Sequence, residues 1–390
     1  MITIQLIFWL SLSLILYSYL MFPEILRLLA RKKEQELEKF LPAELPSVSV
    51  LIAAYNEEKV IGDKIRSVLE SNYLPERLEI LVGSDASTDN TNQVLQQLHE
   101  KHPSLHLSVF TERQGKPGII NQLAKNARGE ILVITDANVM LDKDTLTELI
   151  CYFKEERTGL VDSRMVNTEV KREGISRQEK FYISREVRIK HHESLIWGSM
   201  MGPFGGCYAV RKSLYRPVPD KFLVDDFFIN MTVLKQGKSC ISNIEAMVYE
   251  QASSDPGEEF RRKKRISAGN FQNLSLFWPL IFKCSRGIGF CFFSHKVIRW
   301  FVPFLVMITF GSSILLGTKS GVYLGLAVVH LVALLTPVID QILRKIKIQS
   351  ISLRFVSHFV LMNLALLAGF FRYLGGIKDN VWQPTNRTQD

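Results

Sequence analysis

The sequence predicts an α/β protein in which a mostly parallel, doubly wound sheet is joined to membrane-spanning helices. First, segments of strand and helix character alternate through the middle of the chain, as they do in proteins with parallel sheets. Second, uncharged segments long enough to cross a bilayer stand at both ends of the sequence. Third, 47% of the 390 residues are hydrophobic and the mean hydropathy is +0.08, which is unusual for a water-soluble protein with a net charge of +9.

The same composition excludes several classes of protein. So large a hydrophobic content excludes a disordered chain, and five cysteines in 390 residues are too few for a disulfide scaffold. The cysteines therefore favour a reducing, cytosolic setting. A chain of 390 residues also favours two or three structural units over one.

The N-terminal segment, residues 1–23, contains no charged side chain. About 20 apolar residues suffice to cross the hydrocarbon core of a bilayer. A cleaved signal peptide is the alternative, but such a peptide normally has a basic start and a small-residue cleavage site, and this segment has neither. We therefore expect an uncleaved membrane anchor.

Three more uncharged runs lie near the C-terminus, at residues 300–318, 320–339 and 355–371. Their lack of charge favours membrane spans over a buried helical core, which gives four spans in all. The aromatic segment before them is typical of a helix at the membrane interface. The expected division is an anchor (1–23), a basic linker (24–45), a large domain (46–276), an interfacial segment (277–296), three membrane helices (297–374) and a tail (375–390).

Basic residues next to the expected spans indicate the orientation of the chain. Arg27, Arg31, Lys32 and Lys33 follow the first span, and five consecutive cations, residues 261–265, precede the second. Because cytoplasmic segments near membrane spans are rich in Lys and Arg, we expect the large domain on the cytoplasmic side of the inner membrane. Each such cation near the surface contributes about 1 kcal/mol of attraction to anionic membrane lipid.

The large domain begins with a repeated strand, loop and helix pattern. We expect strands at residues 47–54, 78–83, 105–110 and 130–135, and helices at 59–69 and 117–127, with Ser87 or Thr88 as the cap of a further helix. In such sheets, ligands bind beyond the carboxyl ends of the strands.

Polar residues follow each of the four strands at that edge: Tyr55, Asn56 and Glu57, then Asp85, then residues 113–116, then Asp136 and Asn138. Taken singly, Asn and Asp after a strand are more often turn formers than ligands. Four strand ends with polar residues in the same place favour one binding crevice.

The order of these motifs resembles the family 2 glycosyltransferases, whose nucleotide-binding domain is of the GT-A type, as in membrane-bound bacterial polysaccharide synthases. The resemblance spans roughly residues 45–275 and is carried by residues 50–57 (VLIAAYNE), 84–89 (SDASTD), 113–116 (RQGK), 135–138 (TDAN), Gly205-Gly206 and Asp225-Asp226. It implies a GT-A (Rossmann-like) catalytic domain.

The resemblance implies a donor site for a nucleotide-sugar. Tyr55, Glu57 and Asp85 would face the nucleoside, and Lys116 would neutralise the diphosphate. Asp136 takes the first position of the family's acidic D-x-D motif, where it would hold Mg²⁺ or Mn²⁺. The motif's second acid is replaced by Asn138, whose amide oxygen can bind a cation but brings no charge, so that a plain turn residue is the alternative.

The resemblance also implies a general base. The family pattern assigns this role to the second of two adjacent acids, here Asp226, next to Asp225 in a mostly apolar stretch that favours a raised carboxylate pKa. The alternative is that the two acids only cap a helix at residues 227–235.

Asp225 and four further residues are expected to adjoin the acceptor or the diphosphate. Gly205 and Gly206 allow close backbone approach, although a plain loop explains them nearly as well. Processive synthases carry Q-x-x-R-W where this chain has Arg262 to Ile266, so Arg265 is retained and Arg262 replaces the Gln, which leaves long-chain polymerisation open.

The C-terminal residues 382–387 (WQPTNR) resemble a tail found in some membrane-bound family members. Four spans would put this tail outside the cytoplasm. A tail that closes over the nucleotide would be cytoplasmic, and one span would then be re-entrant.

The sequence and its resemblance to this family therefore predict an inverting, metal-dependent enzyme that moves a hexose-type sugar from a nucleotide donor to a lipid-linked or growing glycan acceptor. The resemblance favours UDP as the nucleotide. Such a reaction would serve exopolysaccharide or cell-surface glycan synthesis. The alternative is a membrane-tethered nucleotide-binding module without catalysis. A nucleic-acid site is not expected, because no stacking aromatics interleave with Arg113 or Lys116.

Overall fold

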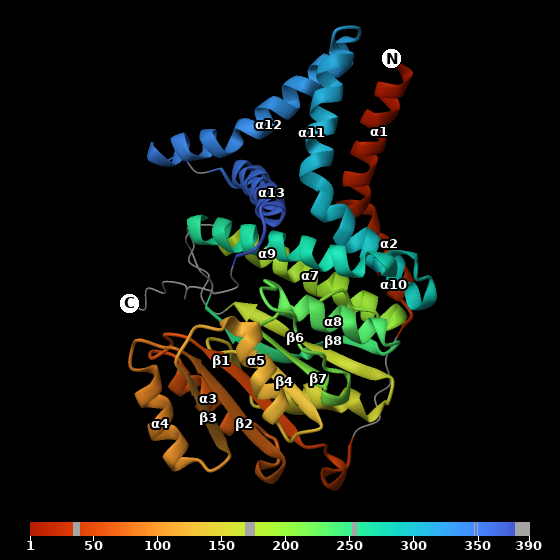
Figure 1. Cartoon of the computed structure of the whole chain (residues 1–390). Helices are drawn as coiled ribbons and strands as arrows, with labels where there is room; N and C mark the ends of the chain where they lie inside the picture. Colours follow the sequence, from red (N-terminus) through yellow and green to blue (C-terminus); the bar gives the residue numbers. More distant parts are fainter. Residues whose placement is uncertain (34–39, 168–175, 252–255, 347, 349, 379–390) are drawn as a thin grey trace.

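The computed structural model describes residues 1–33, 40–167, 176–251, 256–346, 348 and 350–378. An α/β domain forms one end of the molecule and long helices form the other (Figure 1). Two helices, α7 (Ser176–Trp197) and α9 (Pro256–Phe277), lie between these two parts.

One eight-stranded sheet forms the centre of the α/β domain, with the strand order β3-β2-β1-β4-β7-β6-β8-β5. The first four neighbours are parallel, and β7 is antiparallel to both β4 and β6. Strand β8 is parallel to β6, and the short edge strand β5 is antiparallel to β8. Their bounds are β1 Val48–Ala54, β2 Leu78–Asp85, β3 Leu105–Phe110, β4 Ile131–Asp136, β5 Met140–Leu141, β6 Thr158–Asn167, β7 Cys207–Arg211 and β8 Ser239–Glu250.

Helices cover both faces of this sheet. On one face, α3 (Ile61–Leu69), α4 (Thr91–Lys101) and α6 (Thr145–Ile150) share a core with Val50 and Ile52 of β1. On the other face, α5 (Gly115–Asn126) and α8 (Asp225–Lys235) enclose a second core. That second core continues through Phe271 of α9 to Trp300, so the sheet and the helical part share one hydrophobic interior.

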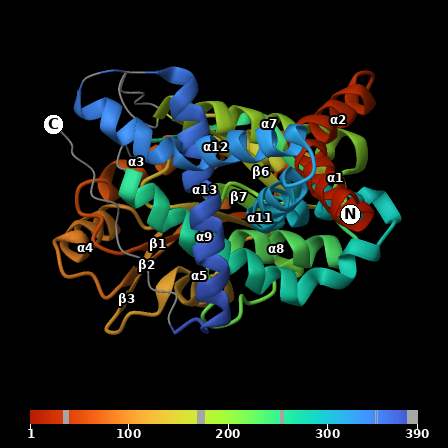
Figure 2. The same ribbon diagram turned by 90° about the horizontal axis from the view of Figure 1, so that it is seen from above.

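The helical part contains, within the described residues, four helical segments that are long and apolar enough to cross a membrane: Ile2–Ala30, Ser285–Gly317, Gly321–Leu343 and Ile351–Leu374. They comprise α1 (Ile2–Leu16) with α2 (Phe22–Ala30), α10 (Ile288–Cys291) with α11 (Ile298–Gly317), α12 (Gly321–Lys345) and α13 (Ile351–Leu374). From above, α13 lies across α9 (Figure 2), and the two helices are in contact. The number and approximate positions of the predicted spans agree with this arrangement.

The expected fold class is confirmed, and two local expectations need correction. The sheet does not end with the four expected strands but continues through β7, β6, β8 and β5. The helix after β2 begins at Thr91 after Asn90, and neither Ser87 nor Thr88 caps it. Both side chains instead hold the loop that follows β1. Ser87 Oγ accepts from the backbone N–H of Asn56, and Thr88 Oγ1 accepts from the side-chain amide of Asn56.

We predict that Gly129→Ala will lower the free energy of unfolding by about 1–3 kcal/mol, because the added methyl group would overpack the interior there. Gly129 lies between α5 and β4, and a Cβ atom at this position would lie 2.5 Å from the backbone nitrogen of Ser49 in the central strand β1. Denaturant unfolding of the detergent-solubilised protein measures the change.

The matched control is Gly62→Ala in α3, where the nearest atom would be 3.9 Å away. Alanine is favoured over glycine inside a helix by roughly 1 kcal/mol, so this variant should be as stable as the wild type or more so. Equal stability of the two variants would contradict the close approach of Gly129 to β1.

Candidate active site

The loops that follow β1 and β2 are joined to each other. Asn56 has a left-handed backbone conformation with φ of 52°, and its side-chain oxygen accepts from the backbone N–H of Thr88 at 2.8 Å. Asparagine is one of the few residues that adopt this conformation at low cost. The turn therefore brings Tyr55 and Glu57, both half-buried, to the rim where β2 ends.

Asp85, the last residue of β2, holds the start of α5. Its fully buried carboxylate accepts from the backbone N–H groups of Gln114 at 2.6 Å and Gly115 at 3.0 Å, and from Arg113 Nε at 3.0 Å. The Arg113 guanidinium in turn lies 3.2 Å from the centre of the Tyr55 ring, a cation–π contact. The structure thus brings Tyr55 and Asp85 together through Arg113, a residue to which the sequence analysis gave no role of its own.

A cluster of three carboxylates surrounds the ammonium of Lys116, in the first turn of α5. Lys116 Nζ lies 2.6 Å from Asp136 Oδ1 and 3.8 Å from Asp225 Oδ2. Burial lowers the pKa of Lys116, but the carboxylates of Asp136, Asp225 and Asp226 outweigh burial and hold the pKa above its ordinary value. Asp136, at the end of β4, and the two acids of α8 therefore share one site, as expected for residues of one crevice.

The two adjacent acids of α8 differ in their surroundings. Burial raises the pKa of Asp226 to about 7, and the neighbouring charge of Asp225 acts in the same direction. Asp226 Oδ1 accepts from the backbone N–H of Phe227 at 2.7 Å. Asp225 Oδ2 is buried and accepts no hydrogen bond from the described residues. Both acids stand inside the first turn of α8, whose N-cap is Val224, so the N-cap alternative is wrong.

The loop that contains Gly205 and Gly206, directly before β7, contacts both the end of β4 and the side chain of Asp226. The carbonyl of Gly206 accepts from the Asp136 backbone N–H and from Thr135 Oγ1, both at 2.9 Å. Gly205 has φ of +85°, and a Cβ atom there would lie 2.5 Å from Asp226 Oδ2. This loop therefore packs directly against the side chain of Asp226.

The two arginines expected near the diphosphate, Arg262 and Arg265, have different partners. Burial lowers the pKa of Arg265, and the carboxylates of Asp225, Asp136 and Asp226 oppose this shift, so Arg265 lies within electrostatic reach of the cluster. Arg262, one turn earlier in α9, bonds Glu259 of the same helix at 2.8 and 2.9 Å. The described interactions of Arg265 thus include the carboxylate cluster, and those of Arg262 include Glu259.

Asn138 lies two residues beyond Asp136, in the turn that leads into β5. Its Nδ2 donates to Glu250 Oε1 at 2.9 Å. Among the described residues, no three His, Cys, Asp or Glu side chains form a ready-made metal site. The oxygen atoms that best suit such an ion are those of Asp136, Asn138 and Asp225, because hard oxygen atoms are the ligands that Mg²⁺ and Mn²⁺ prefer.

Lys64 of α3 is a residue that the sequence analysis missed. It is fully buried and donates to Thr135 Oγ1 at 2.8 Å and to the carbonyl of Val139, one residue before and three after Asp136. Burial lowers its pKa to about 8, against the opposing effects of Cys207 and Asp136. The signal was present, because Lys64 occupies the buried face of the helix with Ile61, Ile65 and Val68.

A second missed residue, Lys190 of α7, supports the loop before β7. Its Nζ pairs with Asp162 at 3.0 Å, and both side chains are buried. The same ammonium lies 3.5 Å from the centre of the Phe204 ring, and Asp162 accepts from the Phe204 backbone N–H at 3.4 Å.

Residues 382–387 of the predicted tail lie outside the described residues.

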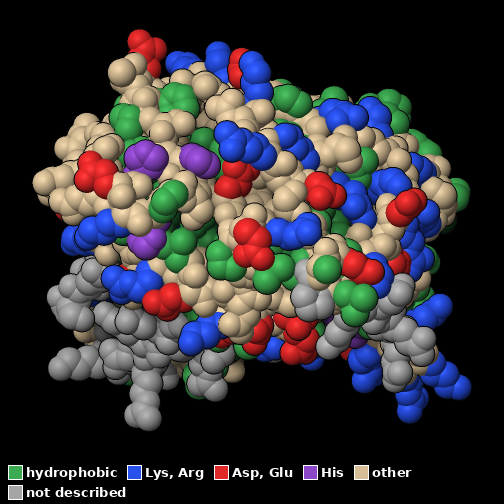
Figure 3. All heavy atoms as spheres, turned by 90° about the horizontal axis from the view of Figure 1, so that it is seen from below, with side chains coloured by type: hydrophobic (Ala, Val, Ile, Leu, Met, Phe, Trp, Pro, Cys, Tyr) green, Lys and Arg blue, Asp and Glu red, His purple; other side chains and the backbone are tan. Residues whose placement is uncertain are grey.

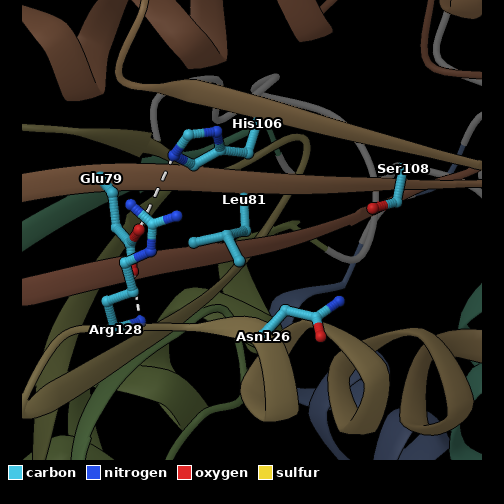
Figure 4. A pocket seen from close by; sticks show the side chains of 6 residues that line it. All are labelled: Glu79, Leu81, His106, Ser108, Asn126 and Arg128. Atoms are coloured by element: carbon cyan, nitrogen blue, oxygen red, sulfur yellow. Dashed lines mark hydrogen bonds and ion pairs between the residues drawn. The ribbon is translucent and has the colours of Figure 1, made fainter.

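A separate cavity of about 180 Å³ opens at the other edge of the sheet (Figure 4). No predicted site residue lines this cavity. The carboxylate of Glu79, which does line it, accepts a hydrogen bond from the backbone N–H of Arg128 at 2.6 Å. The lining side chains come from β2, β3, the end of α5 and the segment after it: Glu79, Leu81, His106, Ser108, Asn126 and Arg128. The face opposite the long helices carries basic and acidic side chains intermixed (Figure 3), without a field of one sign.

Known proteins resemble this chain in sequence. Residues 49–218 match glycosyl transferase family 2. The β-monoglucosyldiacylglycerol synthase of Nostoc sp. is 22% identical over 259 residues, which cover 65% of this chain and 55% of the relative. The poly-β-1,6-N-acetyl-D-glucosamine synthase of Staphylococcus aureus is 31% identical over 113 residues, or 29% of this chain and 27% of that protein. The chain spans about half the length of the first of these relatives.

A solved structure resembles the fold. It is a mannosyltransferase from Pyrobaculum calidifontis in complex with GDP-Man and Mn²⁺, with a TM-score of 0.69 and 20% identity, covering 94% of this chain and 99% of that chain. The sequence match and the shared fold confirm the resemblance inferred from the motifs. The chain therefore contains, at residues 49–218, a glycosyl transferase family 2 domain of the GT-A type, to which candidate membrane helices are attached.

Proposed function

We propose that the chain is an inverting, metal-dependent glycosyltransferase that moves a sugar from a nucleotide donor, with UDP favoured, to a lipid-linked or growing glycan acceptor. The observation that carries this proposal is the cluster in which Asp136, Asp225 and Asp226 surround Lys116. One side of the cluster suits a donor diphosphate and the other side holds a base with a pKa near neutrality.

On the donor side, positive charge is needed. Negative charge grows on the nucleoside diphosphate as its bond to the sugar breaks, and preorganised cations stabilise that charge. Lys116 and Arg265 supply two such cations beside Asp136. The carboxylate of Asp136, the amide oxygen of Asn138 and Asp225 Oδ2, which accepts no hydrogen bond from the described residues, also fit a hard divalent ion, Mg²⁺ or Mn²⁺. When bound, that ion neutralises phosphate charge.

On the acceptor side, Asp226 is the proposed base. A base with a pKa of about 7 is deprotonated in a large fraction of molecules at neutral pH and still attracts a proton strongly. It takes the proton of the acceptor hydroxyl while that oxygen attacks the anomeric carbon and the diphosphate leaves on the opposite side. A single displacement of this kind inverts the anomeric configuration.

The membrane helices bear on the acceptor and the location. Four candidate spans and the basic residues beside them support an inner-membrane protein with its α/β domain in the cytoplasm. The names of two relatives, a glucosyldiacylglycerol synthase and a poly-N-acetylglucosamine synthase, support a lipid or a glycan as acceptor. The rival function is a membrane-tethered nucleotide-binding module without catalysis. Metal-dependent hydrolysis or transfer from a UDP- or GDP-sugar by the purified protein decides between the two.

We predict that Asp226→Asn will lower turnover by a factor of about 10² to 10⁴, because a neutral amide cannot accept the acceptor's proton. Donor binding should change little, since the base acts on the acceptor. Turnover is measured by release of UDP or GDP in a screen of donors with native lipids, and donor binding by calorimetry. Asp220→Asn, at an exposed loop position, is the control and should stay active. Retained turnover in Asp226→Asn would contradict the assignment.

The pH dependence of turnover follows from the raised pKa of Asp226. We predict that kcat/KM will fall about tenfold for each pH unit below about 7 and will level off above it, because only the carboxylate accepts a proton. Initial rates measured across pH 5 to 9 at low donor and acceptor concentrations give this profile, and a profile that is flat through neutrality would contradict the shift.

The same shift affects stability. A raised folded-state pKa means that stability is lost as the pH rises from the ordinary value of 3.8 to about 7. The Asp226→Asn variant, which has no charge to bury, should therefore gain thermal stability over the wild type across that window. A constant difference in melting temperature over the same window would be inconsistent with the raised pKa.

We predict that Gly205→Ala will lower kcat by about tenfold or more, because its Cβ would lie 2.5 Å from Asp226 Oδ2 and would displace the proposed base. Gly237→Ala is the matched control. Gly237 has a similar φ, +81° against +85°, but no atom lies within 4 Å of the position that an alanine Cβ would take, so this variant shares the backbone strain without the contact. Equal kcat in the two variants would show that the contact with Asp226 does not matter.

A further inference from the structure

The departure from the acidic motif at Asn138 leaves the proposed cation site one carboxylate short. Asp136 and Asn138 are both partly exposed, whereas Ala137 and Val139 are buried, so the two polar side chains lie on the outer side of the same turn. An Asp-Asn pair brings one negative charge where two acids would bring two. A neutral amide alone is a weaker partner for a divalent ion than a carboxylate.

A carboxylate from a distant part of the chain lies against this amide. Glu250, the last residue of β8, is 112 positions away in sequence, and its Oε1 accepts from Asn138 Nδ2 at 2.9 Å. The short strand β5 holds the two segments together, because Met140 pairs with Tyr249 and Leu141 with Val248 in antiparallel register. The contact between Asn138 and Glu250 is therefore a consequence of the sheet.

The bond to Glu250 decides which way the amide of Asn138 points. An ionised carboxylate only accepts hydrogen bonds, so it must face the amide NH₂ group, not the amide oxygen. The amide oxygen then lies on the far side of the same planar group, away from Glu250. A fixed amide with its oxygen turned outward is a preoriented cation ligand, whereas an unbonded Asn rotates among several orientations.

We infer that Glu250 is a positioning residue that supplies the missing negative charge of the cation site through Asn138. Carboxylates that hydrogen-bond to a metal ligand orient it and strengthen it as a donor, and their loss typically lowers metal affinity by about 10- to 100-fold. Asp136 and Glu250 together carry the two charges that a pair of acids would carry. This inference rests on the proposed function, in which Asp136 holds a divalent ion.

The inference is tested by Mn²⁺ binding to the full-length protein in detergent, with UDP and then GDP present, followed by the electron paramagnetic resonance signal of free Mn²⁺. We expect Glu250→Gln to raise the Mn²⁺ dissociation constant about tenfold or more. Glu245→Gln, at an exposed position of the same strand, is the matched control and should bind as the wild type does. Melting temperatures without Mn²⁺ show that each variant is folded.

The double variant Asn138→Asp with Glu250→Gln moves the charge back to position 138. The new carboxylate can accept from the amide introduced at position 250, so we expect Mn²⁺ affinity within about threefold of the wild type. Failure of the double variant to recover affinity would overturn the inference, because charge would then not be what Glu250 supplies. Unchanged Mn²⁺ binding by Glu250→Gln would overturn it too.

Asp136→Asn separates the failure of this inference from that of the proposed function. If Asp136→Asn weakens Mn²⁺ binding and Glu250→Gln does not, the cation site stands and the role of Glu250 is overturned. If neither variant weakens binding, the metal-dependent part of the proposed function is overturned together with the inference.

Discussion

The backbone carbonyl of Gly206 holds the candidate active site together. It accepts from the Asp136 N–H and from Thr135 Oγ1, which fastens the end of β4 to the start of β7. Because β7 is antiparallel to β4, it begins at the carboxyl end of the parallel strands. Gly205, the residue before Gly206, therefore lies at that end and packs against Asp226. Lys116 Nζ lies 3.4 Å from the Gly205 carbonyl and 2.6 Å from Asp136, so it spans the same junction. A proposed donor site and a proposed base become neighbours through one reversed strand.

Charge balance is the second constraint on this site. Three carboxylates converge there, and the charges of Lys116, Arg265 and Lys190 act on them. Lys64 lies beneath, in the core, where burial lowers its pKa from 10.5 to about 8. A shift of that size costs the charged form about 3 kcal/mol relative to water. Two hydrogen bonds to the residues around Asp136 offset this cost, and they hold the turn that carries Asp136 and Asn138.

The sequence predicted the first four strands and the acids at their ends, because these strands alternate with helices and end in polar residues. It did not predict α7, whose buried stripe is charged: Glu186, Lys190 and Glu193 are buried at helical spacing, where an apolar stripe is the usual signal. Lys64 and Glu250 were missed for a related reason. The helical spacing of Lys64 indicates only that its side chain is buried, and a single sequence contains no sign of the residues, 71 and 112 positions away, that Lys64 and Glu250 contact.

The charged stripe of α7 also explains how the membrane part bears on the site. Burial raises the pKa of Glu186, but His295, Lys296 and Arg299 outweigh it and hold the pKa well below its ordinary value. Further along the helix, Glu193 bonds the other nitrogen of the His295 ring at 2.7 Å. Removing one partner from a buried group of this kind leaves an uncompensated charge, which typically costs about 3–5 kcal/mol, so the helix and the membrane segment are fixed to each other. Glu193 also accepts from the backbone N–H of Met201, at the start of the loop that runs to Gly205. Because that loop contacts Asp226, the position of the proposed base depends on how α7 packs against the candidate membrane helices.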